Sequence, residues 1–151
     1  MHNKNRNIKT RDFDEITVND NDVIKFVSGM YGFEQYKEYV ILKDSPEDDV
    51  MFLQSLSDAD LSFVLIDPYS IVQEYNPYLN EEDLIELRAK NDADLKYLVI
   101  AIIKEDIKES VVNLKSPIAI NPITREAKQV ILQNDYPLRY NFIVDEGDAG
   151  C

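Results

Sequence analysis

The chain has 151 residues, of which 44% are hydrophobic and 30% are charged, a composition typical of one globular domain. Sixteen Lys and Arg residues stand against 29 Asp and Glu, which gives a formal net charge of −13. Phosphate backbones and anionic lipid surfaces repel such a chain, so we expect neither direct nucleic-acid binding nor membrane binding. A basic protein partner would be attracted, although acidity also serves solubility alone.

Catalytic and metal-binding side chains are scarce. The single histidine, His2, and the single cysteine, Cys151, lie at opposite ends of the chain. This excludes Ser-His-Asp and Cys-His catalysis and a zinc site, and no calcium-loop or phosphate-loop motif is present. We therefore expect a protein with no catalytic, cofactor or metal site that is not an enzyme.

Both ends of the chain indicate a cytoplasmic protein with short disordered termini. The N-terminus has no apolar segment of the kind found in signal peptides, and the longest apolar run, Tyr97–Ile103, is far shorter than the ~20 residues that span a bilayer. We expect a disordered N-terminus at residues 1–7, a folded domain at 8–143 and a disordered acidic tail at 144–151. We also expect a monomer.

Short strands dominate the predicted elements. Nine segments are rich in β-branched and aromatic residues and are separated by polar turn signals. They are residues 8–18, 23–27, 39–43, 50–56, 61–66, 95–103, 110–114, 118–120 and 128–133. This spacing predicts a mainly β fold, a compact β-barrel-like domain of about nine short strands with one short helix.

Three turns between these strands have specific sequence signals. Gly29 and Gly32 lie three residues apart in a chain with four glycines, which indicates positive φ or a close backbone approach. Pro68 has no N–H, so it ends the preceding strand after Asp67. Asn121 and Pro122 predict a turn between two later strands.

One helix is expected after Asn80, which is a favourable N-cap residue. Acidic residues fill its first turn, Lys90 closes its last turn, and Leu84 and Leu87 form a buried stripe. The helix covers a barrel end, presents an acidic contact surface, or does both.

Two segments are candidate partner-binding sites. The first is an aromatic loop, Tyr75, Asn76, Pro77 and Tyr78, followed directly by Glu81, Glu82 and Asp83. Tyrosines beside carboxylates suit a basic partner, although these aromatics could equally close a barrel end. The second contains Asn121, Thr124, Lys128 and Gln129. We predict that substituting Tyr75 and Tyr78 together by Ala weakens a partner complex without unfolding the domain.

Seven segments, taken in order, resemble the FliW family of flagellar assembly factors. They are F-x-x-G-x-x-G-F-E at 26–34, L-Q-S at 53–55, D-x-D-L-x-F-V-L-x-D-P at 58–68, Y-x-P-x-L at 75–79, the acidic helix start at 81–84, L-V-I-A-I-I at 98–103 and N-L-x-x-P-I-x-I-N-P-x-T-x-x-x-K-Q-V-I-L at 113–132. The resemblance covers about residues 8–140. In one departure, Tyr31 stands before the second glycine, where the family more often has Pro.

The resemblance implies a compact β-barrel-like fold and two protein partners. Proteins of this family bind flagellin in the cytoplasm and also bind the translational regulator CsrA, which they prevent from repressing flagellin mRNA. The alternatives are a small-molecule-binding or hydrolytic β-barrel that uses paired carboxylates, and a structural subunit of a larger assembly. The hydrolytic alternative requires a deep pocket, whereas a partner switch requires a broad, shallow face.

Overall fold

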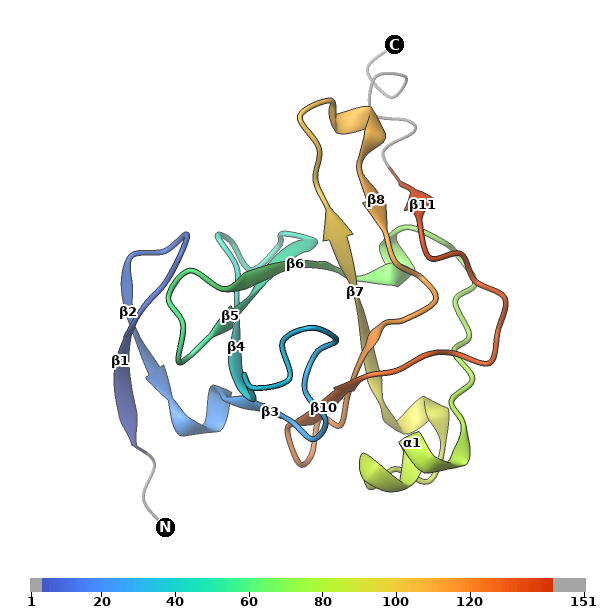
Figure 1. Cartoon of the computed structure of the whole chain (residues 1–151), viewed down its shortest axis with the longest axis horizontal. Coiled ribbons are helices and arrows are strands. Elements are labelled where there is room, and N and C mark those ends of the chain that lie inside the picture. The colour runs from blue at the N-terminus through green and yellow to red at the C-terminus, as the bar shows by residue number, and fades with distance from the viewer. Residues whose placement is uncertain (1–3, 143–151) are drawn as a thin grey trace.

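The computed structural model describes residues 4–142, which form eleven strands and one α-helix, with four short 3-10 helices (Figure 1). The strands are β1 (Asn5–Lys9), β2 (Glu15–Asn19), β3 (Ile24–Phe26), β4 (Glu38–Leu42), β5 (Val50–Ser55), β6 (Ser62–Ile66), β7 (Lys96–Ile102), β8 (Val111–Val112), β9 (Ile118–Ile120), β10 (Glu126–Gln129) and β11 (Tyr140–Asn141). The helix is α1 (Glu81–Glu86), and the 3-10 helices are η1 (Asp20–Asp22), η2 (Pro68–Ser70), η3 (Asp92–Asp94) and η4 (Ile107–Glu109).

Seven of these strands form a closed barrel. Neighbours pair in the order β7-β6-β5-β4-β3-β10-β9, and β9 pairs back onto β7, so the ring has no free edge. The pairing of β3 with β10 is parallel, and the other pairings in the ring are antiparallel. Strands β8 and β11 extend the sheet outward from the far end of β7. The predicted mainly β, barrel-like fold is confirmed.

Three apolar clusters hold the fold together. The barrel interior is filled by alternate residues of its strands, including Leu53, Leu65 and Ile118. A second cluster lies on the outer side of β6, β7 and β8, where the chain between β6 and α1 covers Val99 and the final segment of the domain adds Leu132. A third, smaller cluster packs the β1–β2 hairpin against β4.

The prediction of a single strand at residues 8–18 was wrong. This segment forms most of a hairpin of two strands, β1 and β2. The chain reverses at Asp14, whose φ is +59°, and the Asp14 carbonyl accepts a hydrogen bond from the Thr10 N–H at 2.7 Å. The Thr10 hydroxyl in turn accepts from the Phe13 N–H at 2.7 Å. With this split and the unpredicted β11, the strand count rises from about nine to eleven.

The described chain begins with an ordered strand. Residues 5–7, expected in a disordered N-terminus, lie in β1 and pair with residues 17–19 of β2. The expected tail, residues 144–151, lies outside the described residues. Between residues 4 and 142, no helix is long and apolar enough to cross a bilayer.

Helix α1 begins as predicted and ends earlier. The Asn80 side chain accepts a hydrogen bond from the Asp83 N–H at 2.8 Å, as an N-cap does. The helix ends at Glu86, and Arg88 has a φ of +57°, so Lys90 lies beyond the last turn that it was predicted to close. Leu87 is fully buried, as predicted, and Leu84 packs against the same cluster.

The paired glycines adopt the predicted backbone conformation, with φ of +75° at Gly29 and +85° at Gly32. At Gly29 a Cβ atom would lie 2.8 Å from the Cα of Glu34, so only glycine fits there without a shift. The turn places Phe33 over the barrel interior, where its ring meets that of Phe63 with centroids 5.2 Å apart. This loop therefore helps to close the barrel.

Candidate functional site

An open hollow of about 790 Å³ lies between the aromatic loop, the chain that joins α1 to β7, and residues 134–136. We call it the tyrosine hollow, because Tyr69, Tyr75, Tyr78, Tyr97 and Tyr136 all line it. Figure 1 shows these segments together on the right of the molecule, at the side of the barrel away from β1 and β2. The predicted loop thus forms one wall of a concave surface.

The floor of the hollow is built from buried tyrosines. Tyr75 is 1% exposed, and its hydroxyl donates to the carbonyl of Leu114 at 2.7 Å. Its ring contacts those of Tyr136 and Tyr69, with centroids 4.8 Å and 5.8 Å away. Burial raises the pKa of Tyr75, and the nearby hydroxyl of Tyr136 raises it further. Tyr75 is therefore a neutral, hydrogen-bonded core residue.

The loop backbone above this floor is held by side chains from the far end of the domain. The Asn76 N–H donates to the Tyr136 hydroxyl at 2.9 Å, and the Tyr78 N–H donates to Asn134 Oδ1 at 2.8 Å. The Asn134 amide group returns a hydrogen bond to the Asn76 carbonyl at 2.9 Å. This fixed backbone presents the Tyr78 side chain to solvent with 60% of its surface exposed.

The acidic start of α1 lies directly after this loop. The side chains of Glu81 and Glu82 are exposed, whereas Asp83 is buried. Asp83 pairs with the ammonium group of Lys128 at 2.6 Å, and Glu86 pairs with the same group at 2.7 Å. The exposed carboxylates of the helix start are therefore those of Glu81 and Glu82.

Hydrogen bonding to Lys128 lowers the pKa of Glu86 below its usual range. Burial lowers the pKa of Lys128, but the hydrogen bonds to Asp83 and Glu86 outweigh burial and leave that pKa above its ordinary value. One carboxylate pair is thus brought together here, and it shares a cation. An ionised, cation-paired carboxylate is poorly suited to donate a proton in acid–base catalysis.

The second predicted segment supports the end of α1. Asn121 is buried, and its amide group donates to the carbonyl of Leu87 at 2.8 Å, while its Oδ1 accepts from the Ile123 and Thr124 N–H groups. Gln129 is also buried, and its Oε1 accepts from the Tyr31 N–H at 3.2 Å. Both side chains serve folding in this structure.

The structure brings the two predicted segments together, since Lys128 and Asn121 both contact α1 and the residues that end it. The predicted site residues differ in their exposure to solvent. The buried ones are Tyr75, Pro77, Asp83, Asn121 and Gln129; Thr124 and Lys128 are half-buried; Asn76, Tyr78, Glu81 and Glu82 are exposed.

Several residues that line the hollow were not predicted. Tyr97 donates its hydroxyl hydrogen to the Asp92 carbonyl at 2.7 Å, and Asp92 Oδ1 accepts from the Leu79 N–H at 3.0 Å. Tyr69 and Tyr136 were missed because they are far in sequence from the aromatic loop. The abundance of tyrosine, nine in the chain, was the available signal. Within residues 4–142, no three His, Cys, Asp or Glu side chains gather as metal ligands do.

The architecture defines a class of protein: a small closed β-barrel with an acidic helix beside an open, tyrosine-lined hollow. A family model described as FliW protein matches residues 7–142. The chain therefore belongs to the FliW family, and the resemblance found in the sequence is confirmed.

Similar proteins agree with this membership. The chain is 37% identical over 134 residues to the flagellar assembly factor FliW of Caldicellulosiruptor bescii, covering 88% of both chains. It is 35% identical over 137 residues to the FliW of Natranaerobius thermophilus, covering 89% of this chain and 91% of that protein. A crystal structure of the flagellar assembly factor FliW superposes with a TM-score of 0.83 at 31% identity, covering 91% of this chain and 96% of that chain.

Proposed function

We propose that this protein is a cytoplasmic flagellar assembly factor that acts by binding other proteins and catalyses no reaction. Its partners are flagellin and an RNA-binding regulator of the CsrA type, whose repression of flagellin mRNA it antagonises. Family membership over residues 7–142 and the names of the relatives, flagellar assembly factors, support the proposal. We assign the activity to the domain at residues 8–143.

The observation that carries the binding role is the exposed Tyr78 beside the exposed carboxylates of Glu81 and Glu82. Tyrosine supplies a large contact area with little conformational entropy to lose, and it is enriched among residues that dominate protein interfaces. A net charge of −13 attracts basic partners and speeds their encounter.

Charge also gives a mechanism for antagonism. A regulator that binds RNA is basic at its RNA site, so an anionic protein bound beside that site disfavours the approach of phosphate. Linkage requires that RNA weaken the protein–regulator complex by the same factor. The regulator's RNA affinity, measured with and without this protein at several salt concentrations, tests this mechanism. Inhibition that does not change with salt contradicts it.

The contact surface is tested with Tyr78→Ala alone, because Tyr75 is buried and its substitution would perturb the fold. We expect Tyr78→Ala to weaken capture of purified flagellin, CsrA or both by at least about tenfold, the effect of roughly 1.4 kcal/mol. Ile123→Ser is the matched control, since Ile123 is 90% exposed and lies in the β9–β10 turn. Undiminished capture of both partners by Tyr78→Ala removes this site from consideration.

The hollow also permits a test of the small-molecule alternative. Its volume is sufficient for a metabolite, although its lining combines tyrosines with the polar side chains of Asn76, Asn91 and Asn134. Turnover of a metabolite by the purified protein, abolished by a substitution in the hollow and not by Ile123→Ser, would replace the binding proposal.

A further inference from the structure

The inward-facing residues of β7 do not remain inside the barrel. Leu98, Ile100 and Ile102 share one face of this strand, since side chains alternate along it. Leu98 is 1% exposed and pairs with β9 within the ring, Ile100 is half-buried, and Ile102 is 49% exposed beyond the ring. One apolar row thus runs from the protein core into solvent.

Neighbouring strands continue this exposed row. Val111 of β8 lies directly opposite Ile102, and Ile100 lies opposite Leu65 of β6. Towards β4, Phe63 and Ile41 are half-buried on the same inner face, since both lie opposite Leu53 of β5. We define the barrel-mouth surface as Phe33, Ile41, Phe63, Ile100, Ile102 and Val111.

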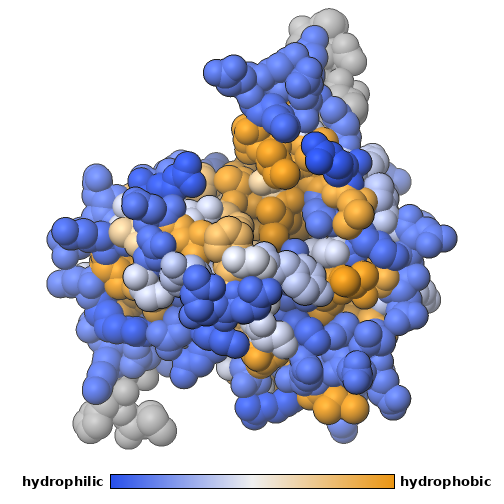
Figure 2. Space-filling model, viewed as in Figure 1, coloured by the Kyte–Doolittle hydropathy of each residue, from blue (hydrophilic) through white to orange (hydrophobic). Residues whose placement is uncertain are grey.

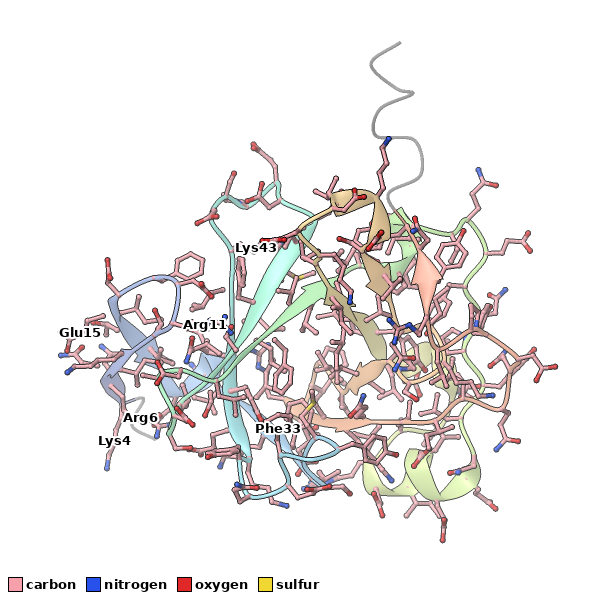
Figure 3. The ribbon with its side chains drawn as sticks, turned by 45° about the horizontal axis from the view of Figure 1, so that its top comes forward. Lys4, Arg6, Arg11, Glu15, Phe33 and Lys43 are labelled. Atoms are coloured by element: carbon pink, nitrogen blue, oxygen red, sulfur yellow. The ribbon has the colours of Figure 1, made fainter. Side chains whose placement is uncertain are left out.

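The figures show the region of the molecule in which this surface lies. Figure 2 shows a broad hydrophobic area at the front of the molecule where β6 meets β7, below the hydrophilic tip of the β7–β8 hairpin. Figure 3 labels Phe33 in the loop at the front of the barrel and Lys43 at the rim beside the same hairpin. Ile103 and Ile107, in the connection from β7 to β8, are also about half exposed.

A partner that covers this surface must do so with side chains. The backbone groups here are already paired: residues 101–102 of β7 pair with β8, and the Ile100 carbonyl accepts from the Asn113 N–H at 3.0 Å. A sheet face without free backbone groups is covered by a helix that lays an apolar stripe across it.

The rim specifies the charge of that helix. The β4–β5 turn begins shortly after Ile41, and the β7–β8 connection directly follows Ile102, so both connections flank the barrel-mouth surface. Together they carry seven carboxylates and three lysines, a net charge of −4; the carboxylates are Asp44, Glu47, Asp48, Asp49, Glu105, Asp106 and Glu109, and the lysines are Lys43, Lys104 and Lys108. An apolar surface within an anionic rim complements a helix with Lys or Arg on both sides of its apolar stripe.

We propose that the barrel-mouth surface binds an amphipathic α-helix that has an apolar stripe flanked by basic residues. The barrel-mouth surface is separate from the tyrosine hollow, and its occupant is defined by charge and apolar stripe alone, whether or not flagellin or CsrA binds the protein. Ile102, at the exposed end of the apolar row, is the main apolar contact, and the rim carboxylates orient the basic flanks.

The probe is a synthetic, fluorescently labelled helical peptide of about 20 residues, long enough to form a helix, with Leu at i, i+3, i+4 and i+7 and Lys on both flanks. Its partner peptide has Glu in place of each Lys. Anisotropy titration of the full chain should show binding of the Lys peptide only, weakened by added salt because the rim charges are screened.

Substitution then locates the site. Ile102→Asp should weaken Lys-peptide binding at least about tenfold. Ile123→Asp is the control and should leave binding unchanged, because Ile123 follows Ile120, which pairs with Lys96 at the opposite end of β7. Ile102→Ser provides a second variant without added charge, and circular dichroism confirms that each variant is folded.

Three outcomes overturn the proposal. The first is equal affinity for the Lys and Glu peptides, and the second is an equal loss of binding in the Ile102 and Ile123 variants. The third comes from sedimentation of the protein alone: a dimer that Ile102→Asp dissociates would mean that a second copy of the chain covers this surface.

Discussion

The tyrosine hollow and the barrel-mouth surface both carry large apolar side chains at the margin of the barrel, and they use them in opposite ways. In the hollow, Tyr75 and Tyr97 are buried and their hydroxyls donate to backbone carbonyls. At the mouth, Ile102 is half exposed and no strand or loop covers it among the described residues. Aromatic residues of a conspicuous loop can therefore serve folding, while an apolar residue at the end of a strand remains available for contact.

The largest expected effect on stability is at Tyr75, and the comparison with Tyr78 distinguishes a core tyrosine of the hollow from an exposed one. Tyr75→Ala should lower the free energy of unfolding by about 3–5 kcal/mol, because it leaves a cavity and an unpaired Leu114 carbonyl. Tyr78→Ala should change it by less than about 0.5 kcal/mol, since Tyr78 is mostly exposed. Urea unfolding measures both, and equal losses would contradict the assignment of Tyr75 to the core.

The next effect concerns the ion pairs that fasten α1 to β10. Lys128→Met should cost about 3 kcal/mol, because the buried Asp83 carboxylate would lose its cation. Arg88→Met is the control, since the Arg88 side chain pairs with Glu126 at 2.9 Å but is largely exposed. Similar losses in the two variants would mean that burial of the Lys128 pair adds no stability.

The same ion pairs predict a pH dependence. The pKa of Glu86 is lowered in the folded protein, so its pairing stabilises the fold fully above the ordinary Glu pKa of about 4.3 and is lost as pH falls through the lower folded value. The pKa of Lys128 is raised, so its contribution is full below about 10.4 and is lost as pH rises through the higher folded value. Unfolding free energies measured against pH should be flatter at both ends in Lys128→Met.

A smaller effect probes the loop that closes the barrel beside the mouth. Gly29→Ala should cost about 2 kcal/mol, from left-handed backbone strain and from contact with Glu34. Gly32→Ala should cost about 1 kcal/mol, since it shares the positive φ but its Cβ would meet no atom within 4 Å. The difference in unfolding free energy isolates the steric contact, and a larger loss at Gly32 would refute it.

The smallest effect on the free energy of unfolding is expected at the barrel-mouth surface. Ile102→Ser should change the free energy of unfolding by less than about 1 kcal/mol, because half of the side chain already lies in solvent. A cost comparable to that of Tyr75→Ala would show that the side chains of the mouth stabilise the fold as much as those of the hollow do. The contrast between the two regions would then be lost.

Local chemistry made much of the fold predictable. Alternating apolar residues located most strands, Asn80 marked the start of the helix, and Gly29 and Gly32 marked the positive-φ turn. The end of α1 was not predictable in this way, because the Leu87 carbonyl is bound by Asn121, a side chain 34 residues further along the chain. The hairpin between β1 and β2 was missed because its reversal depends on a non-glycine residue, Asp14, at positive φ.

The candidate site was predicted by residue type and not by exposure. Tyr75 and Tyr78 are the same kind of residue three positions apart, and only contacts with Leu114 and Tyr136 decide that the first is buried. Likewise, Asp83 is one of three carboxylates at the helix start in the sequence, and only its contact with Lys128, 45 residues away, distinguishes it from the others. Burial depends on distant parts of the chain, so a single sequence could name the segment but not its accessible members.

The parallel pairing of β3 with β10 has a consequence for how the molecule is made. It joins residues 25–26 to residues 126–127, so the ring can close only after residues 126–127 have been synthesised. Contacts this distant in sequence also slow folding, because a long loop must be ordered before they form. A growing polypeptide therefore has no finished barrel until β10 has left the ribosome and can pair with β3.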